Sequence, residues 1–403
     1  MRTLIVSDLH LGSLSRSDLL RRPEIRAQLI EALADVDRLV LLGDVLELRH
    51  GPLRDALAAA RPFFEDLGSA LAGRELLLTA GNHDHALVEP WLARRGEERE
   101  PPPLELEQLI EPRDASPAIE RIAEWSAPAR VRVAYPGVWV RPDVYAIHGH
   151  YLDSHLTVPT LERLSVGAMS RLLGRPPASF ESVGDYEAVG APIFAWRDAI
   201  SRDTRTGSAL NGLATVAAWR ALGGVDGASA GDDGGRGRGR DRDRGRGRGA
   251  GALASRRRAA GRRLRARALI GSFPLAVAAL NRAGLGPLRA DISPGELRRA
   301  GLRAMGEVSA RLGLADAHVV FGHTHRAGPL AGDREDEWRG PDGARLVNAG
   351  SWTYSEVFVT AKQSESPYWP GACVLVGDDG PPQLRRLLQD RSQAELKPAP
   401  RER

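Results

Sequence analysis

Five short apolar runs along the chain are each followed by a polar motif. The runs are residues 3–7, 39–42, 76–79, 144–147 and 318–321. The motifs are Asp8-Leu9-His10, Gly43-Asp44, Gly81-Asn82-His83-Asp84, His148-Gly149-His150 and Gly322-His323-Thr324-His325. Short apolar runs bounded by Gly, Asp, Asn or His are typical of buried strands in an α/β fold. Since such folds bind ligands at strand ends, we expect these carboxylate, amide and imidazole groups to form a dinuclear metal site.

Taken together and in this order, the five motifs resemble the signature of the calcineurin-like metallophosphoesterases. That signature is Asp-x-His, Gly-Asp, Gly-Asn-His-(Asp/Glu), His and Gly-His-x-His, and every part of it is present. The resemblance covers residues 3–152 and 316–376. It implies a four-layer α/β/β/α sandwich of two mixed sheets, whereas motif order alone predicts only an α/β fold with ligands at strand ends.

The resemblance also implies two metal positions that share one carboxylate. The first would be held by Asp8, His10, Asp44 and His325, and the second by Asp44, Asn82, His148 and His323. Oxygen and imidazole donors without thiolate suit two divalent ions, Mn²⁺ first and otherwise Fe, Zn or Ni. The implied reaction is hydrolysis of a phosphate ester or pyrophosphate by a hydroxide that bridges the ions, because bound metal lowers the pKa of water to about 7.

His83 is the catalytic candidate that is not a ligand. The resemblance places it facing the substrate, where it would donate a proton to the leaving oxygen or place a cation beside the developing charge. Asp84 is expected to fix the tautomer of His83 and to raise its pKa. His150 and Tyr151 are weaker candidates for substrate binding, and His150 could also support the neighbouring ligand.

Three further polar residues near the motifs have open roles. His85 and His155 could line the cleft or be solvated, and Asn348 in the turn at residues 346–351 is expected to be mainly scaffolding. Residues 131–133 and 138–140, with a turn at residues 135–137, predict a β-hairpin that leads into the strand before His148.

A chain of 403 residues exceeds the usual size of one domain, so we expect a catalytic core with an insertion. The predicted core is residues 1–152 and 316–380, and the insertion is residues 153–315. Helical apolar spacing occurs within the insertion at residues 158–173, 193–200, 210–222, 253–270, 274–281 and 294–312. These segments predict a helical cap over the metal site. Bacterial pyrophosphohydrolases of nucleotide-linked lipid precursors have a similarly placed insertion, but their pattern after the fourth motif is not reproduced.

Charge is distributed unevenly along the chain. Residues 236–267 contain 14 Arg and two Asp, a local charge of +12, whereas the whole chain carries +4. The remaining residues therefore sum to −8. The Arg/Gly-rich segment, residues 223–250, lacks the apolar content to form a core and is expected to be disordered. The tail, residues 381–403, is expected to be disordered as well.

The arginines have three interpretations. The segment could be a solvated loop, or it could bind nucleic acid through phosphates, although no aromatic residues interleave to stack bases. Arg256 to Arg265, followed by apolar residues 269–280, could instead contact an anionic membrane. The longest nearly uncharged apolar stretch, residues 268–280, is below the ~20 residues that a membrane span needs.

The single cysteine, Cys373, lies in an apolar run and is expected to be a buried thiol in a reducing compartment. A cleavable signal peptide would remove Asp8, so we expect a cytoplasmic protein, with a peripheral membrane location possible.

Two other functions compete with hydrolysis of a phosphorylated small molecule or lipid-linked substrate. A nuclease of the same superfamily would cleave DNA or RNA and would need the basic segment. A non-catalytic metal-binding scaffold is the alternative of another class, and the intact ligands and the His83-Asp84 pair argue against it.

Overall fold

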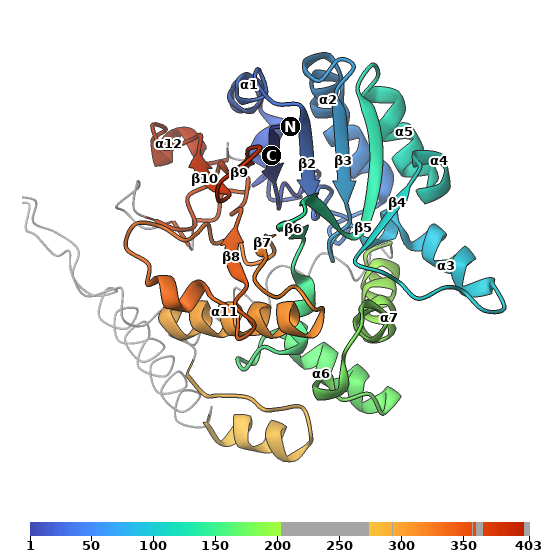
Figure 1. The fold of residues 1–403 in the computed structure, drawn as a ribbon, viewed down its shortest axis with the longest axis vertical. Helices are drawn as coiled ribbons and strands as arrows, with labels where there is room; N and C mark the ends of the chain where they lie inside the picture. The colour runs from blue at the N-terminus through green and yellow to red at the C-terminus, as the bar shows by residue number, and fades with distance from the viewer. Residues whose placement is uncertain (203–273, 292, 357, 360–365, 399–403) are drawn as a thin grey trace, which may run out of the picture.

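The computed structural model describes residues 1–202, 274–291, 293–356, 358–359 and 366–398. Its fold is mixed α/β, with one large sheet and helices around it (Figure 1). The strands are β1 (Thr3–Val6), β2 (Arg38–Leu42), β3 (Glu75–Thr79), β4 (Glu107–Ile110), β5 (Arg130–Arg141), β6 (Val144–Ile147), β7 (His318–Phe321), β8 (Arg345–Asn348), β9 (Ala372–Val376) and β10 (Gln383–Arg386). All five predicted apolar runs therefore form strands.

The α-helices among the described residues occur in three groups. The first group, within the N-terminal part, is α1 (Pro23–Ala32), α2 (Leu53–Ala70), α3 (Glu89–Glu97), α4 (Pro112–Ala115) and α5 (Pro117–Trp125). The second group lies in the insertion and comprises α6 (Leu161–Leu173), α7 (Val183–Arg202), residues 274–282 and α11 (Pro294–Arg311). The third is α12 (Gln393–Leu396). Short 3₁₀ helices are η1 (Leu19–Arg21), η2 (His85–Leu87), η3 (His150–Ser154), η4 (Pro177–Ser179) and η5 (Glu335–Trp338).

The sheet order is β10-β9-β1-β2-β3-β5-β6-β7-β8, and β4 pairs with β5 beside this path. Strands β1, β2, β3 and β5 run parallel, and so do β6, β7 and β8, whereas β9 and β10 are antiparallel at one end. Parallel neighbours place their carboxyl ends at one edge, so the loops after β1, β2 and β3 start from the same side of the sheet.

Strand β5 joins the two halves of the sheet, and this corrects the hairpin prediction. Residues 130–133 pair with β3, whereas residues 137–141 pair with β6. The predicted turn at residues 135–137 lies inside this single 12-residue strand. Apolar residues on either side of a Pro-Gly pair suggested two strands, but they form one strand that passes from one half to the other.

Three buried clusters hold the fold together. One joins the first half of the sheet to α1, α2 and α5, and another joins β6, β7 and β8 to α6, α7 and α11. The third consists of small aliphatic residues from both halves of the sheet, including Ile5, Val40, Val144, Val320 and Val374. Alternate residues of each strand thus face a shared apolar layer, which fixes how the strand ends of the two halves meet.

Helices of the insertion follow the sequence predictions where the structure describes them. Those predicted at residues 158–173, 193–200, 274–281 and 294–312 are confirmed as helical, and α7 begins ten residues before its predicted start. Ser293 caps α11 by accepting a hydrogen bond from the backbone N–H of Glu296, with Pro294 next in the chain. The segments predicted at residues 210–222 and 253–270, and the Arg/Gly-rich segment, lie outside the described residues.

The prediction of a disordered tail from residue 381 is wrong for its described part. Strand β10 pairs with β9, and the side chains of Leu388 and Leu396 are fully buried. A few apolar residues spaced among many charges were enough to anchor this segment. No helix in the described part of the chain combines the length and apolar character needed to cross a bilayer.

Candidate metal centre

Loops from both halves of the sheet are joined by short hydrogen bonds at one place. The backbone N–H of His10 donates to the carbonyl of Asp44 at 2.8 Å, and that of His83 donates to Asp44 Oδ1 at 2.8 Å. The N–H of His323 donates to Asp8 Oδ2 at 2.9 Å, although these residues are 315 positions apart. The motifs are therefore one assembly, in which the acidic side chains also hold the neighbouring backbones.

The backbone at these motifs is strained. Asp8, His10, Asp44, His323 and His325 have φ between 47° and 64°, the left-handed region that non-glycine residues avoid. They make up five of the seven such non-glycine residues that the structure describes. Each costs about 1–3 kcal/mol, a strain that clusters at functional sites and persists only where the surroundings enforce it.

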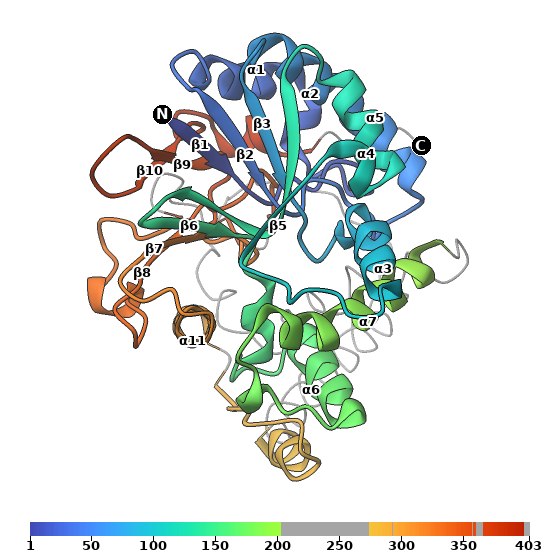
Figure 2. The same cartoon turned by 45° about the vertical axis from the view of Figure 1, so that its right-hand side comes forward.

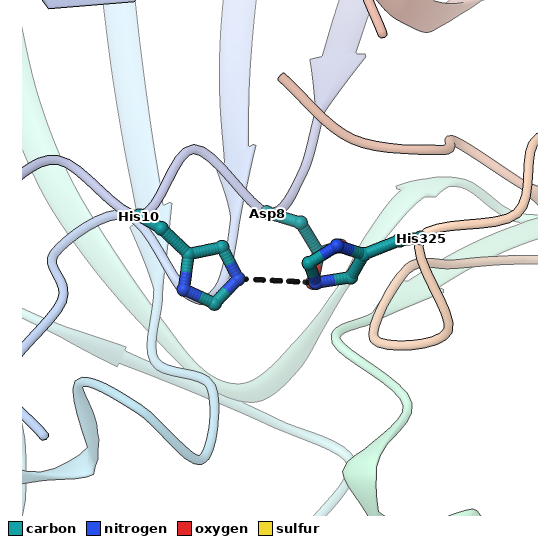
Figure 3. A group of neighbouring side chains, drawn as sticks. All are labelled: Asp8, His10 and His325. Carbon is teal, nitrogen blue, oxygen red and sulfur yellow. Dashed lines mark hydrogen bonds and ion pairs between the residues drawn. The ribbon is translucent and has the colours of Figure 1, made fainter. Parts of the chain in front are cut away.

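Asp8, His10 and His325 form the first side-chain group, and Figure 3 shows them turned toward one another. The Nε2 atoms of His10 and His325 are 3.1 Å apart, and His325 Nε2 is 3.2 Å from Asp8 Oδ1. Asp8 is fully buried, and its Oδ1 accepts no hydrogen bond from a described residue. Two imidazole nitrogens and an uncapped carboxylate oxygen directed at one point suit a divalent cation.

The second group lies on the other side of Asp44. His148 Nε2 is 3.4 Å from Asp44 Oδ2 and 3.2 Å from Asn82 Oδ1, and His323 joins Asp44 and His148 in one potential metal-binding cluster. Asp44 Oδ2 is also 3.7 Å from His10 Nε2, in the first group. The structure therefore brings all seven predicted ligands together, with Asp44 between the two groups.

Each histidine of these groups has its second ring nitrogen held by another atom. His10 Nδ1 is 3.0 Å from Glu47, His148 Nδ1 is 3.0 Å from the carbonyl of Leu42, His323 Nε2 is 3.1 Å from Asp153, and His325 Nδ1 is 3.3 Å from Thr353. Metal-binding histidines are oriented in this manner, because the second contact fixes the tautomer and leaves one nitrogen lone pair for the ion.

The charges at the site depend on one another. Burial raises the pKa of Asp44, but the neighbouring His148, His83 and His10 outweigh it and hold this pKa well below its ordinary value. Burial lowers the pKa of His148, but Asp44 and Asp8 raise it to about 9. The buried carboxylates thus require nearby positive charge, which a metal ion supplies in exchange for protons.

His83 is oriented by Glu47 rather than by Asp84, which corrects the prediction. Its Nδ1 is 2.9 Å from Glu47 Oε2, while Arg49 donates to its Nε2 at 2.9 Å. Burial and the charge of Arg49 lower the pKa of His83 to about 4, the opposite of the expected rise. In this arrangement the imidazole is neutral, with its proton on Nδ1.

Asp84 binds backbone instead. Its carboxylate accepts from the N–H groups of Gly81, Asp44, Val45 and Leu46 at 2.7–3.2 Å. It is fully buried, and burial together with Asp44 raises its pKa to about 6. Asp84 therefore shapes the loops that carry the Gly43-Asp44 and Gly81-Asn82 motifs, and the expectation that it fixes the tautomer of His83 is wrong.

The secondary candidates have separate surroundings. His150 is 3% exposed, and neither of its ring nitrogens has a hydrogen-bond partner among the described residues. The hydroxyl of Tyr151 donates to Glu187 at 2.5 Å, and His85 Nε2 is 3.3 Å from the same carboxylate. His155 Nε2 is 2.8 Å from the hydroxyl of Tyr186.

Asn348 has the scaffolding contacts that the sequence suggested. Its side-chain amide donates to the carbonyl of Gly322 at 2.9 Å and to Thr324 Oγ1 at 3.0 Å. Its side-chain oxygen accepts from the N–H of Gly350 at 2.9 Å. It thereby braces the loop that carries His323 and His325.

Sequence reasoning missed four residues around the centre. They are Glu47, Arg49, Asp153 and Arg197, and each is less than one-tenth exposed. A signal was present for two of them, because Glu47 and Arg49 follow Asp44 by three and five positions on the same loop. Asp153 and Arg197 belong to the insertion, and no periodic pattern distinguishes them from the other charged residues there.

Comparison with known proteins agrees with this geometry. Residues 1–175 match the family model for calcineurin-like phosphoesterases. The match includes four of the five motifs and ends two residues after α6. No curated protein matches the chain.

Proposed function

We propose that this chain, whose residues 1–175 match the family model for calcineurin-like phosphoesterases, is a member of that family and hydrolyses a phosphate ester or pyrophosphate at a pair of divalent ions. The family and the clustered His and Asp side chains fit a metal-dependent phosphoesterase. The observation that carries the proposal is the position of Asp44 between two imidazole-carboxylate groups. In each group the histidines have one ring nitrogen in contact with another residue, which fixes the orientation of the ring.

In this proposal Asp8, His10, Asp44 and His325 hold one ion, and Asp44, Asn82, His148 and His323 hold the other. The donor set fits, since it offers oxygen and imidazole ligands, and the buried Oδ1 of Asp8 accepts no hydrogen bond from any residue that the structure describes. Manganese is the proposed metal. When bound, the two ions would lower the pKa of the attacking water and neutralise charge on the phosphate.

The protein's own groups would position the ester and its leaving oxygen. His83 Nε2 lies 4.0 Å from Asp44 Oδ2, so this atom is next to the proposed reaction centre. Glu47 keeps the Nδ1 proton in place, and Arg49 donates to Nε2 and to the carbonyl of Asn82 at 2.9 Å each. We propose that Arg49 turns to a phosphate oxygen, which frees His83 Nε2 to take up a proton from solvent and then to donate it to the leaving oxygen, while the Nδ1 proton stays with Glu47.

The finer architecture is also part of the proposal. Three clusters, one between the two halves of the sheet and one on each outer face, support a four-layer sandwich. Residues 153–315 would be the cap, because α6 and α7 carry residues that contact the metal-centre loops. We propose a cytoplasmic location with peripheral contact to anionic lipid through the Arg-rich segment, residues 236–267.

Two rival functions have less support. A nuclease would need a basic groove for the polynucleotide, whereas the carboxylates of Glu47 and Asp153 contact His10 and His323 at the centre. A non-catalytic scaffold would need no His83 oriented by Glu47 and Arg49, and both of these partners are buried in place.

The test is hydrolysis of a chromogenic phosphodiester with and without Mn²⁺, combined with measurement of bound metal. Wild type should show metal-stimulated turnover. Asp44→Ala should lose bound metal and activity together, whereas His83→Ala should retain metal and lose turnover. His318→Ala is the matched control, because this histidine lies at the start of β7, outside the motifs, and should behave as wild type.

The outcomes separate the functions. Absence of metal-stimulated hydrolysis of any ester by the wild type would favour the scaffold. Preferential, salt-sensitive cleavage of DNA or RNA that requires the Arg-rich segment would favour the nuclease.

A further inference from the structure

A small cavity lies beside the metal centre, between the core and two helices of the insertion. Its lining includes His150, Asp153 and Ser154 from η3, Glu162 and Val166 from α6, and Tyr186, Phe194 and Arg197 from α7. Helices α6 and α7 lie side by side below the sheet in Figures 1 and 2. Because Asp153 also contacts His323, the cavity borders a proposed metal ligand and extends away from it into the insertion.

The walls of the cavity combine aromatic faces with buried polar groups. The Arg197 side chain is 7% exposed, and its guanidinium donates to Glu162 at 3.3 Å and to Ser165 Oγ at 3.2 Å. His150 contributes two ring nitrogens that have no hydrogen-bond partner among the described residues. Burying such nitrogens without partners costs free energy, so these walls favour a ligand that can donate and accept hydrogen bonds.

Several ligands do not suit this lining. An acyl chain would leave the imidazole of His150 unpaired and would bring apolar carbon against Glu162 and Arg197. A second phosphate would meet the carboxylates of Asp153 and Glu162. The space is also small, about 20 Å³ for the centre of a water-sized sphere, which suits one water or one hydroxyl group rather than a base or a polynucleotide.

We propose that the cavity is a leaving-group subsite that binds a hydroxyl of a polyol, so that the enzyme hydrolyses phosphate esters of hydroxylated alcohols such as glycerol or a sugar. A hydroxyl donates one hydrogen bond and accepts others, which matches Glu162 as acceptor and Arg197 as donor, with the ring nitrogens of His150 as further hydrogen-bonding groups. The carbon-bound hydrogens of such an alcohol would pack against the ring of Phe194. This inference rests on the proposed phosphoesterase function and names its substrate class.

The experiment compares glyceryl phosphate with propyl phosphate, and their methyl diesters in parallel, in the presence of Mn²⁺. Product formation is followed by phosphorus NMR, and kcat/KM is measured for each ester. The two leaving alcohols differ in basicity, which alone changes kcat/KM. We therefore compare the ratio of kcat/KM for the glyceryl ester to that for the propyl ester between each variant and the wild type, because the difference in basicity is the same in both proteins and cancels. The variants are Glu162→Gln, which keeps the shape of the side chain, and Ser154→Ala, which is available should Glu162→Gln not fold.

Glu162→Gln should lower the glyceryl-to-propyl ratio by about fivefold or more, because the hydroxyl would then donate to a neutral amide oxygen in place of a carboxylate, and only the glyceryl ester has this hydroxyl. Leu172→Gln is the control on the same helix, since this side chain is 79% exposed, and it should leave the ratio unchanged. A smaller change in Glu162→Gln, in a protein that hydrolyses the chromogenic diester, would overturn the subsite and leave the phosphoesterase proposal standing. No metal-stimulated hydrolysis of any ester would overturn both.

Discussion

Substitution of Glu47 by glutamine should impair catalysis without unfolding the protein. Its carboxylate, 3% exposed, contacts His10 Nδ1 at 3.0 Å and His83 Nδ1 at 2.9 Å, and it accepts from the N–H of Arg49 at 3.0 Å. Glutamine has a single side-chain oxygen, and its NH₂ group cannot accept. With its oxygen in the Oε1 position, glutamine leaves His10 without an acceptor, and with its oxygen in the Oε2 position its NH₂ group faces the backbone N–H of Arg49. Either orientation removes one hydrogen bond, and the carboxylate charge beside both imidazoles is lost.

The size of the effect follows from the bond that is lost. A hydrogen bond to a charged group is worth about 1.5–3 kcal/mol, which corresponds to roughly 10- to 150-fold in kcat/KM. Loss of an outer contact to a metal-binding histidine typically costs about 10- to 100-fold, so the two expectations agree. We therefore expect Glu47→Gln to reduce turnover of the chromogenic diester by at least about tenfold, with weaker retention of Mn²⁺ through His10.

The matched variant is Asp84→Asn, which removes the carboxylate that the sequence had assigned to this role. Its four backbone N–H contacts predict a loss of thermal stability of a few degrees, with the His83–Glu47 contact kept. Steady-state kinetics, metal analysis and thermal melting distinguish the two variants. A kcat/KM of Glu47→Gln within about threefold of the wild-type value would refute the assignment of Glu47 as the group that positions His83.

Three further predictions concern other parts of the molecule. Burial raises the pKa of the Cys373 thiol to about 12, so a thiol reagent at pH 8 should label no cysteine in the folded protein and one after denaturation; labelling of the folded protein would show that β9 is accessible. Glu187→Gln weakens a buried acceptor of Tyr135, Tyr151 and His85, so proteolysis within α7 should become faster, and an unchanged rate would mean that this network does not anchor the insertion. Deletion of residues 234–249 should leave hydrolysis of the chromogenic diester intact while reducing sedimentation with anionic vesicles, and loss of hydrolysis would give the segment a catalytic role.

Much of the core could be predicted because its motifs are local. A run such as residues 39–42 followed by Gly43-Asp44 specifies both a buried strand and a functional loop, and the structure has the strand at residues 38–42. Position 43 requires glycine for a steric reason as well, since a Cβ at Gly43 would collide with the ring of His148. Strand, turn and ligand were therefore encoded within a few residues of one another.

The orientation of His83 could not be predicted from its neighbour in sequence. Asp84 is adjacent along the chain, but its carboxylate turns toward backbone N–H groups of two loops. Glu47 belongs to the loop after β2, and only the parallel pairing of β2 with β3 brings it to His83. Contacts of this kind depend on register between strands, which a motif does not contain.

The errors at β5 and β10 have a related cause. Local turn chemistry at Tyr135-Pro136-Gly137 predicted a hairpin, yet each half of β5 finds a different partner strand. In the tail, the polar composition suggested disorder, but pairing with β9 and the burial of Leu388 order it. In both places tertiary contacts override the local preference.

The central claim is that two cations lie on either side of Asp44, and anomalous diffraction from crystals soaked in manganese tests it most directly. We expect two manganese peaks that share Asp44, one also contacting Asp8, His10 and His325, and the other Asn82, His148 and His323. A single peak, or peaks held by other residues, would contradict it.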